Sequence, residues 1–225
     1  AAIIIMAVIG LINFQGIHHA WLASRHDGIA AIVTFVATLG FAPHLDNGIL
    51  IGAGLAIGLF LYRTMQPRVA ILGRHADGNL RDREVFPELP KCPEVIILRF
   101  DGRLYFANVP YFEDAVLAAV ADNPQAQILL IAGSAINEVD ASGQEALRNL
   151  VRRLRGAGVE VMFSGLKKQI YDVLRATHLE EDLGLTNFYA TDEEALAAIG
   201  ARLGAETIAP LLCRPVAGVQ AQSGQ

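Results

Sequence analysis

The chain has 225 residues, of which 53% are hydrophobic, 18% charged and 7% aromatic. An ordinary soluble domain has roughly 45–50% apolar residues, so this composition excludes a disordered chain. The net charge of −5 lacks the basic field that non-specific nucleic-acid binding needs, and no nucleic-acid partner is expected. Two cysteines, Cys92 and Cys213, form neither a disulfide framework nor a metal-binding spacing.

The apolar excess lies in residues 1–66, which contain two basic and two acidic residues. Three runs there lack charge and have no clear polar face: Ala1–Ile12, Ile29–Ala42 and Ile49–Tyr62. Each run is shorter than the roughly 20 residues of an ideal membrane span. The alternative is that these runs form helices buried in a soluble core. Helices that are apolar all round suit lipid better, so three membrane segments are predicted.

The basic residues predict how these segments are oriented. Arg25 precedes the second run and Arg63 follows the third, whereas the connector 43–48 has no Lys or Arg. The positive-inside rule therefore puts both arginines, and everything after Arg63, in the cytoplasm. The segment Asn13–Asp27 is amphipathic and is predicted to form an interfacial helix.

Small residues in the third run recur at four-residue spacing. Gly48, Gly52 and Ala56 would share one helix face, and Gly54 and Gly58 another. Such spacing lets a neighbouring helix approach closely, although a merely flexible, glycine-rich span would have the same composition.

Residues 67–225 alternate short β-branched runs with amphipathic helices. The dipeptide Asp101–Gly102 suits a two-residue turn, so a β-hairpin is predicted between 95–100 and 103–108. Strands alternating with helices after this hairpin predict an α/β domain with a mixed sheet covered by helices. In chain order, the other predicted strands are 69–73, 128–131, 159–163 and 187–190, and the helices are 110–122, 142–155, 167–177 and 192–203. Residues 206–225 are predicted to be a flexible tail.

Within residues 67–225 the sequence shows no nucleophile–base pair, metal-ligand cluster or phosphate-binding glycine loop. An enzyme is therefore not expected, and no catalytic residue, metal or cofactor is assigned. The suggestive segment is Asn137–Leu147, which delivers Asp140, Ser142 and Gly143 to the start of a helix. Ser142 and Glu145 fit an S-x-x-E capping box, the interpretation that local physics favours. The alternative is that Ser142 is phosphorylated, with its phosphate at the positive end of the helix dipole.

These segments together resemble a known family. The residues 101–108 (DGRLYFAN), 128–131 (ILLI) and 139–143 (VDASG) resemble a STAS domain, the sulfate-transporter and anti-sigma-factor-antagonist module. The preceding residues 47–74 resemble the last membrane helix and exit segment of a SulP-type anion transporter. The resemblance covers about residues 1–204.

The resemblance implies a carrier built from two inverted repeats of membrane helices, followed by a cytoplasmic STAS domain. This chain would contain the last membrane segments (1–66), the STAS domain (67–205) and the tail (206–225). In antagonist relatives the serine before the loop glycine is the phospho-acceptor, which implies that role for Ser142, with Asp140 and Gly143 in the regulatory loop. Substrate-binding residues are expected upstream of the chain.

Two functions follow from the resemblance. The leading hypothesis is the C-terminal part of a secondary anion transporter for sulfate, bicarbonate, chloride or dicarboxylates, integral to the plasma (inner) membrane. The alternative is a membrane-tethered STAS signalling module, switched by phosphorylation and acting by partner binding. The implied partners are a small anion, the lipid bilayer, upstream transmembrane helices, a second copy of the chain and a regulatory protein at the STAS domain.

Overall fold

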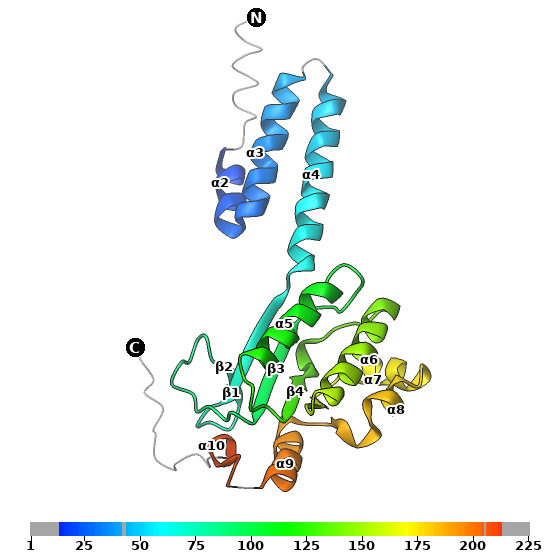
Figure 1. The fold of residues 1–225 in the computed structure, drawn as a ribbon. Helices are drawn as coiled ribbons and strands as arrows, with labels where there is room; N and C mark the ends of the chain where they lie inside the picture. The colour runs from blue at the N-terminus through cyan, green and yellow to red at the C-terminus, as the bar shows by residue number, and fades with distance from the viewer. Residues whose placement is uncertain (1–13, 42–43, 205, 213–225) are drawn as a thin grey trace, which may run out of the picture. The chain divides into compact units, whose positions relative to one another are not determined.

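The computed structural model describes residues 14–41, 44–204 and 206–212. The chain divides into two compact units, Ala1–Met65 and Gln66–Gln225 (Figure 1). The first predicted membrane segment, Ala1–Ile12, lies outside the described residues.

The first unit is helical, with α2 (Phe14–Ala23), α3 (Arg25–Gly40) and α4 (Leu45–Met65). Among the described residues, one helix is long and apolar enough to cross a membrane, over Asp46–Met65, and the apolar part of α3, Gly28–Gly40, is shorter. The predicted interfacial segment Asn13–Asp27 is not one helix, because Ser24 interrupts it and α3 already begins at Arg25. Trp21 and Leu22 of α2 are exposed.

Two glycines of α4 bring it close to α3. A Cβ atom at Gly48 would lie 2.7 Å from the backbone nitrogen of Thr38, and one at Gly52 would lie 2.8 Å from Cβ of Thr34. Side chains essentially never approach that closely, so only glycine fits at either position. The prediction of close approach at Gly48 and Gly52 is confirmed, but Ala56 is exposed and does not extend this contact.

The second unit is a six-stranded mixed sheet in the order β2-β1-β3-β4-β5-β6. Strands β2, β1 and β3 pair antiparallel, and β3 to β6 pair parallel. The strands are β1 (Arg68–Arg74), β2 (Leu80–Asp82), β3 (Val95–Asp101), β4 (Ile128–Ala132), β5 (Glu160–Ser164) and β6 (Phe188–Tyr189). The helices are α5 (Val109–Ala121), α6 (Ala141–Gly156), α7 (Lys168–Ala176), α8 (Leu179–Leu183), α9 (Asp192–Leu203) and α10 (Ala209–Leu212).

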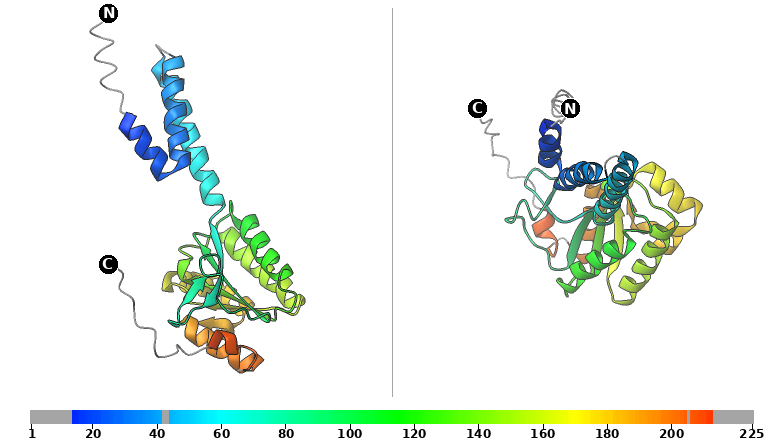
Figure 2. Two further views of the ribbon diagram at one scale, coloured as in Figure 1. Left: turned by 90° about the vertical axis from the view of Figure 1, so that its left-hand side faces the viewer. Right: turned by 90° about the horizontal axis from the view of Figure 1, so that it is seen from above.

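Alternation along the strands divides the core between the two faces of the sheet. In β3, Ile96, Leu98 and Phe100 belong to the cluster formed with α5, α6, α7 and α8. Val95 and Ile97 point to the opposite face because successive side chains of a strand alternate, and they pack with α9 and α10. The two groups of helices can be followed in Figure 2. The predicted mixed sheet covered by helices is confirmed.

The predicted hairpin at Asp101–Gly102 is wrong. The antiparallel partner of β3 is β1, which pairs Arg68 with Asp101 and Val69 with Phe100. Residues 103–108 form no strand, because the Asn108 side chain accepts from the Tyr105 N–H (3.0 Å) and donates to the Arg103 carbonyl (2.7 Å). These contacts fold the segment into turns that lead into α5.

The predicted flexible tail also differs from the structure at its start. Residues 209–212 form α10, and Ile208 and Leu211 are 0% and 3% exposed. Both side chains belong to the apolar cluster that includes α9. This burial orders a segment whose sequence has no helical periodicity. Residues 213–225 lie outside the described part of the chain.

Candidate regulatory site at the start of helix α6

Two loops come together at the start of α6. Leu104 and Val139 form an isolated parallel bridge, in which the Leu104 N–H donates to the Glu138 carbonyl at 2.9 Å. The Asp140 N–H donates to the Leu104 carbonyl at 3.0 Å. Leu104 is completely buried, so the loop after β3 is fixed to the loop that carries Asp140.

Asp140 joins these loops to the helix. Its Oδ1 accepts from the Gly143 N–H at 2.7 Å, and its Oδ2 accepts from the Phe106 N–H at 3.0 Å. Asp140 is therefore the N-cap of α6. Both carboxylate oxygens are satisfied by backbone donors, and such charge-assisted bonds are among the stronger ones in proteins.

The predicted capping box of Ser142 and Glu145 is wrong. Ser142 lies in the first turn of α6, after the cap, and its side chain is exposed. Glu145 pairs with Arg148 at 2.6 Å and accepts from Asn149 at 3.2 Å. Because the cap is two residues earlier, the Ser142 hydroxyl is not needed for the helix start.

Gly143 of α6 packs directly against the Leu104–Val139 bridge. A Cβ atom there would lie 2.7 Å from the Leu104 carbonyl oxygen and 3.1 Å from Cγ1 of Val139. Gly143 is buried, so a side chain could not turn to solvent. The structure thus brings together all three predicted loop residues, with Asp140 and Gly143 as structural elements and Ser142 facing outward.

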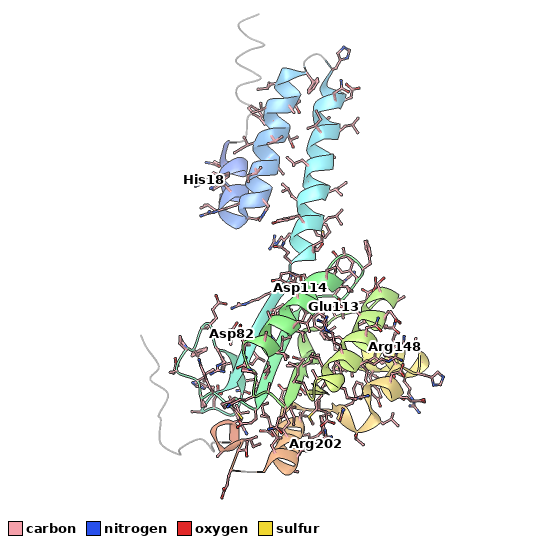
Figure 3. The ribbon with its side chains drawn as sticks, viewed as in Figure 1. His18, Asp82, Glu113, Asp114, Arg148 and Arg202 are labelled. Atoms are coloured by element: carbon pink, nitrogen blue, oxygen red, sulfur yellow. The ribbon has the colours of Figure 1, made fainter. Side chains whose placement is uncertain are left out.

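The surface around Ser142 is acidic and partly apolar. A shallow depression beside Ser142 is lined by Glu113 of α5 and by Glu145, Val109 and Ala141. Figure 3 labels Glu113 and Asp114 on α5 and Arg148 on α6. Arg148 is engaged by Asp182 and Glu145, which raise the pKa of its guanidinium, with Asp182 the larger cause. A phosphate on Ser142 would therefore add charge beside two glutamates.

An exposed aromatic side chain lies on the same loop as the cap partner. The Phe106 side chain is 71% exposed, although its N–H is held by Asp140. Its ring meets Tyr105 edge-on, with centroids 5.5 Å apart. The sequence predicts a strand at Phe106, and this contact could be anticipated only from Asn108, which lies immediately before α5.

We expect Asp140→Ala to lower the free energy of unfolding of residues 66–212 by about 2 kcal/mol, because a lost helix cap costs about 0.5–2 kcal/mol and the Phe106 N–H also loses its acceptor. Urea unfolding of this fragment, followed by circular dichroism, measures the change. Asp114→Ala on the exposed surface of α5 is the control and should change little. Equal stabilities for the two variants would contradict this role of Asp140.

Within the described residues, no group of three or more histidine, cysteine, aspartate or glutamate side chains is arranged to hold a metal ion. The site presents an exposed Ser142 hydroxyl in the first turn of a capped helix, beside Glu113 and Glu145. Such a surface suits modification and protein contact.

Comparison with known proteins is consistent with this geometry. Residues 86–195 match the model of the STAS domain family. The chain is 26% identical over 215 residues to high affinity sulfate transporter 2 of Stylosanthes hamata, covering 91% of this chain and 32% of that protein. It is 28% identical over 216 residues to sulfate transporter 1.2 of Arabidopsis thaliana, covering 92% and 33%. The chain thus spans about a third of the length of these relatives.

The solved structure of the murine Solute Carrier 26 family member A9 anion transporter has the same fold. The match has a TM-score of 0.75 and 20% identity, and it covers 87% of this chain and 32% of that one. The second unit of the chain therefore contains a STAS domain. With its helical unit and this domain together, the chain belongs to the SulP anion-transporter family and corresponds to its C-terminal part.

Proposed function

We propose that the chain works as the C-terminal part of a secondary transporter for small anions, with sulfate the first substrate to test. The observation that carries the proposal is the extent of the matches to sulfate transporters, about 90% of the chain and thus both units. A soluble signalling protein with a STAS domain would have no use for the helical unit.

The helical unit supports a location in the membrane. Helix α4 contains a 20-residue candidate membrane span, Asp46–Met65, with exposed large side chains such as Leu50, Ile57 and Phe60. Contiguous apolar surface of this kind is rare on soluble monomers and suits lipid or neighbouring membrane helices. We propose that the unit lies in the plasma (inner) membrane and that the STAS domain, after Arg63, is cytoplasmic.

Reporter fusions test this orientation. Green fluorescent protein fused after residue 225 should fluoresce, and alkaline phosphatase at the same position should be inactive, because the former folds in the cytoplasm and the latter in the periplasm. A phosphatase fused within the 43–48 connector should be active. The reverse pattern would contradict the orientation.

The coding sequence upstream of Ala1 separates a carrier from a membrane-tethered signalling module. A carrier needs enough membrane helices to enclose a pathway, so an in-frame extension with further apolar spans is expected. A stop codon immediately upstream, without such spans, would favour the tethered module.

The STAS domain is proposed to regulate the carrier, with Ser142 as the phospho-acceptor and Asp140 and Gly143 supporting it. The support is geometric, since Ser142 is exposed on a helix start that is already capped. We also propose that a regulatory protein, or the STAS domain of a second copy, contacts this surface.

Ser142→Ala should reduce phosphate incorporation in cells to background while leaving the fold and the basal anion flux unchanged. The reason is that Ser142 makes no contribution to the cap and faces solvent. Mass spectrometry of the purified protein measures phosphate occupancy, and Ser134→Ala, at another exposed serine, is the control. Unchanged phosphate in Ser142→Ala, or none in the parent under any growth condition, would exclude Ser142 as a switch.

A further inference from the structure

The segment Glu206–Leu212, called the strap below, packs beside α9 on one face of the STAS-domain sheet. It follows α9, whose C-cap residue Gly204 has a φ of +90°. Ile208 and Leu211 insert into the cluster that contains Ala70 and Leu72 of β1. Two apolar side chains thus hold a segment whose helix is only four residues long.

The strap has two further attachments. Nη1 of Arg74, the last residue of β1, donates to the Leu211 carbonyl at 3.2 Å. The Cys92 thiol lies 3.6 Å from the Thr207 carbonyl, and Cys92 is 6% exposed. The strap therefore directly contacts the buried Cys92 side chain.

Arg74 combines a mostly buried side chain with a weak ion pair. Its side chain is 15% exposed, and its nearest carboxylate, Glu193, is 4.0 Å away and itself 79% exposed. Its Nε is buried without a hydrogen-bond partner among the described residues. A desolvated guanidinium with so weak a counter-ion depends on the carbonyl that it reaches.

We propose that the strap is a detachable element, latched to β1 by Arg74, which opens while the rest of the STAS domain stays folded. Opening removes Ile208 and Leu211 from the sheet and uncovers the Cys92 thiol together with the apolar surface of β1. Segments with few apolar anchors open at a lower free energy than the whole domain. The strap is thus a built-in switch between a covered and an exposed apolar face.

Thiol labelling measures this opening. The full chain is purified in detergent as a Cys213→Ser variant, so that Cys92 is the only cysteine, and labelled with a disulfide-exchange reagent at fixed pH. Burial, followed by the hydrogen bond to Glu94, raises the pKa of the Cys92 thiol, so labelling of the closed form is slow. When reclosing is fast, the rate reports the fraction of molecules in which the strap is open.

Arg74→Gln should increase the labelling rate about tenfold, corresponding to about 1.4 kcal/mol. Arg81→Gln is the control, because Arg81 pairs with Asp77 on the exposed side of β2 and does not touch the strap. Ile208→Ala removes an apolar anchor without touching Arg74, and it should also accelerate labelling.

Urea distinguishes strap opening from global unfolding. Local opening exposes little surface, so the labelling rate should change little at low urea, whereas unfolding of the domain depends steeply on it. The proposal is overturned if Arg74→Gln and Ile208→Ala label at the parent's rate. It is equally overturned if labelling in every variant follows the urea dependence of global unfolding.

Discussion

Replacing Gly52 with leucine is expected to prevent the helical unit from packing and to remove most of the folded protein from the membrane. The small-residue face of α4 lets Thr34 of α3 lie where a side chain would otherwise be. Helices in a membrane associate through close van der Waals contact, which a leucine at this position would replace with overlap. The Thr34 hydroxyl cannot relieve it by rotation alone, because a Cβ at Gly52 would also press on Cβ of Thr34.

Gly54→Leu is the matched control on the same helix. A Cβ at Gly54 would have none of the described residues within 4 Å, and Gly54 is exposed, so leucine has room there. The yield of monodisperse protein in mild detergent, measured by size-exclusion chromatography, should fall at least about fivefold for Gly52→Leu and remain near the parent's for Gly54→Leu. Equal yields would show that the α3–α4 contact does not determine assembly.

Gly143→Ala is expected to destabilise the STAS domain by about 2 kcal/mol, because overpacking a well-filled site typically costs about 1–3 kcal/mol. The added methyl would lie 2.7 Å from a backbone oxygen, that of Leu104, which cannot rotate away. Either α6 moves off the Leu104–Val139 bridge or the Asp140 cap breaks. In both cases the surface around Ser142 changes.

Gly156→Ala, at the other end of α6, separates this steric effect from helix propensity. A Cβ there meets nothing within 4 Å, and alanine is favoured over glycine in a helix by about 1 kcal/mol. Urea unfolding of residues 66–212 should therefore give opposite shifts for the two variants. The fragment extends to Leu212 so that it includes Ile208 and Leu211, which pack against the sheet. A stabilised Gly143→Ala would contradict the packing described for the site.

Elements with strong periodicity could be predicted from the sequence. In α6, Leu147, Leu150, Val151 and Leu154 recur at helical spacing, and all four are buried in the structure. The helix predicted over residues 192–203 has the bounds of α9. These helices can be predicted from the local sequence because each buries one apolar face, and that face repeats at helical spacing.

The hairpin and the tail could not be predicted because tertiary contacts decide them. The dipeptide Asp101–Gly102 favours a turn, but β1 is the antiparallel neighbour of β3. The Asn108 side chain accepts from the Tyr105 N–H and holds the next segment in a turn. Ile208 and Leu211 lack periodicity and are ordered by the surface of the sheet. Both outcomes depend on residues distant in sequence.

At the candidate site the sequence predicts the helix start correctly but assigns the cap to Ser142 instead of Asp140. Asp140, Ser142 and Gly143 do meet at a helix start, yet Asp140 and not Ser142 is the cap. The Asp140 carboxylate caps the helix and also accepts a hydrogen bond from the Phe106 N–H, on a loop 34 residues earlier. No local motif indicates that second donor.

Anion flux through the purified product of the whole reading frame tests the central claim most directly. The protein is reconstituted in liposomes loaded with unlabelled sulfate, and entry of radiolabelled sulfate, bicarbonate or chloride is measured against empty liposomes. Saturable entry of at least one of these anions, suppressed by an excess of the same unlabelled anion outside, is the predicted result. Folded, membrane-inserted protein that moves none of these anions faster than empty liposomes would contradict a carrier and favour a tethered signalling module.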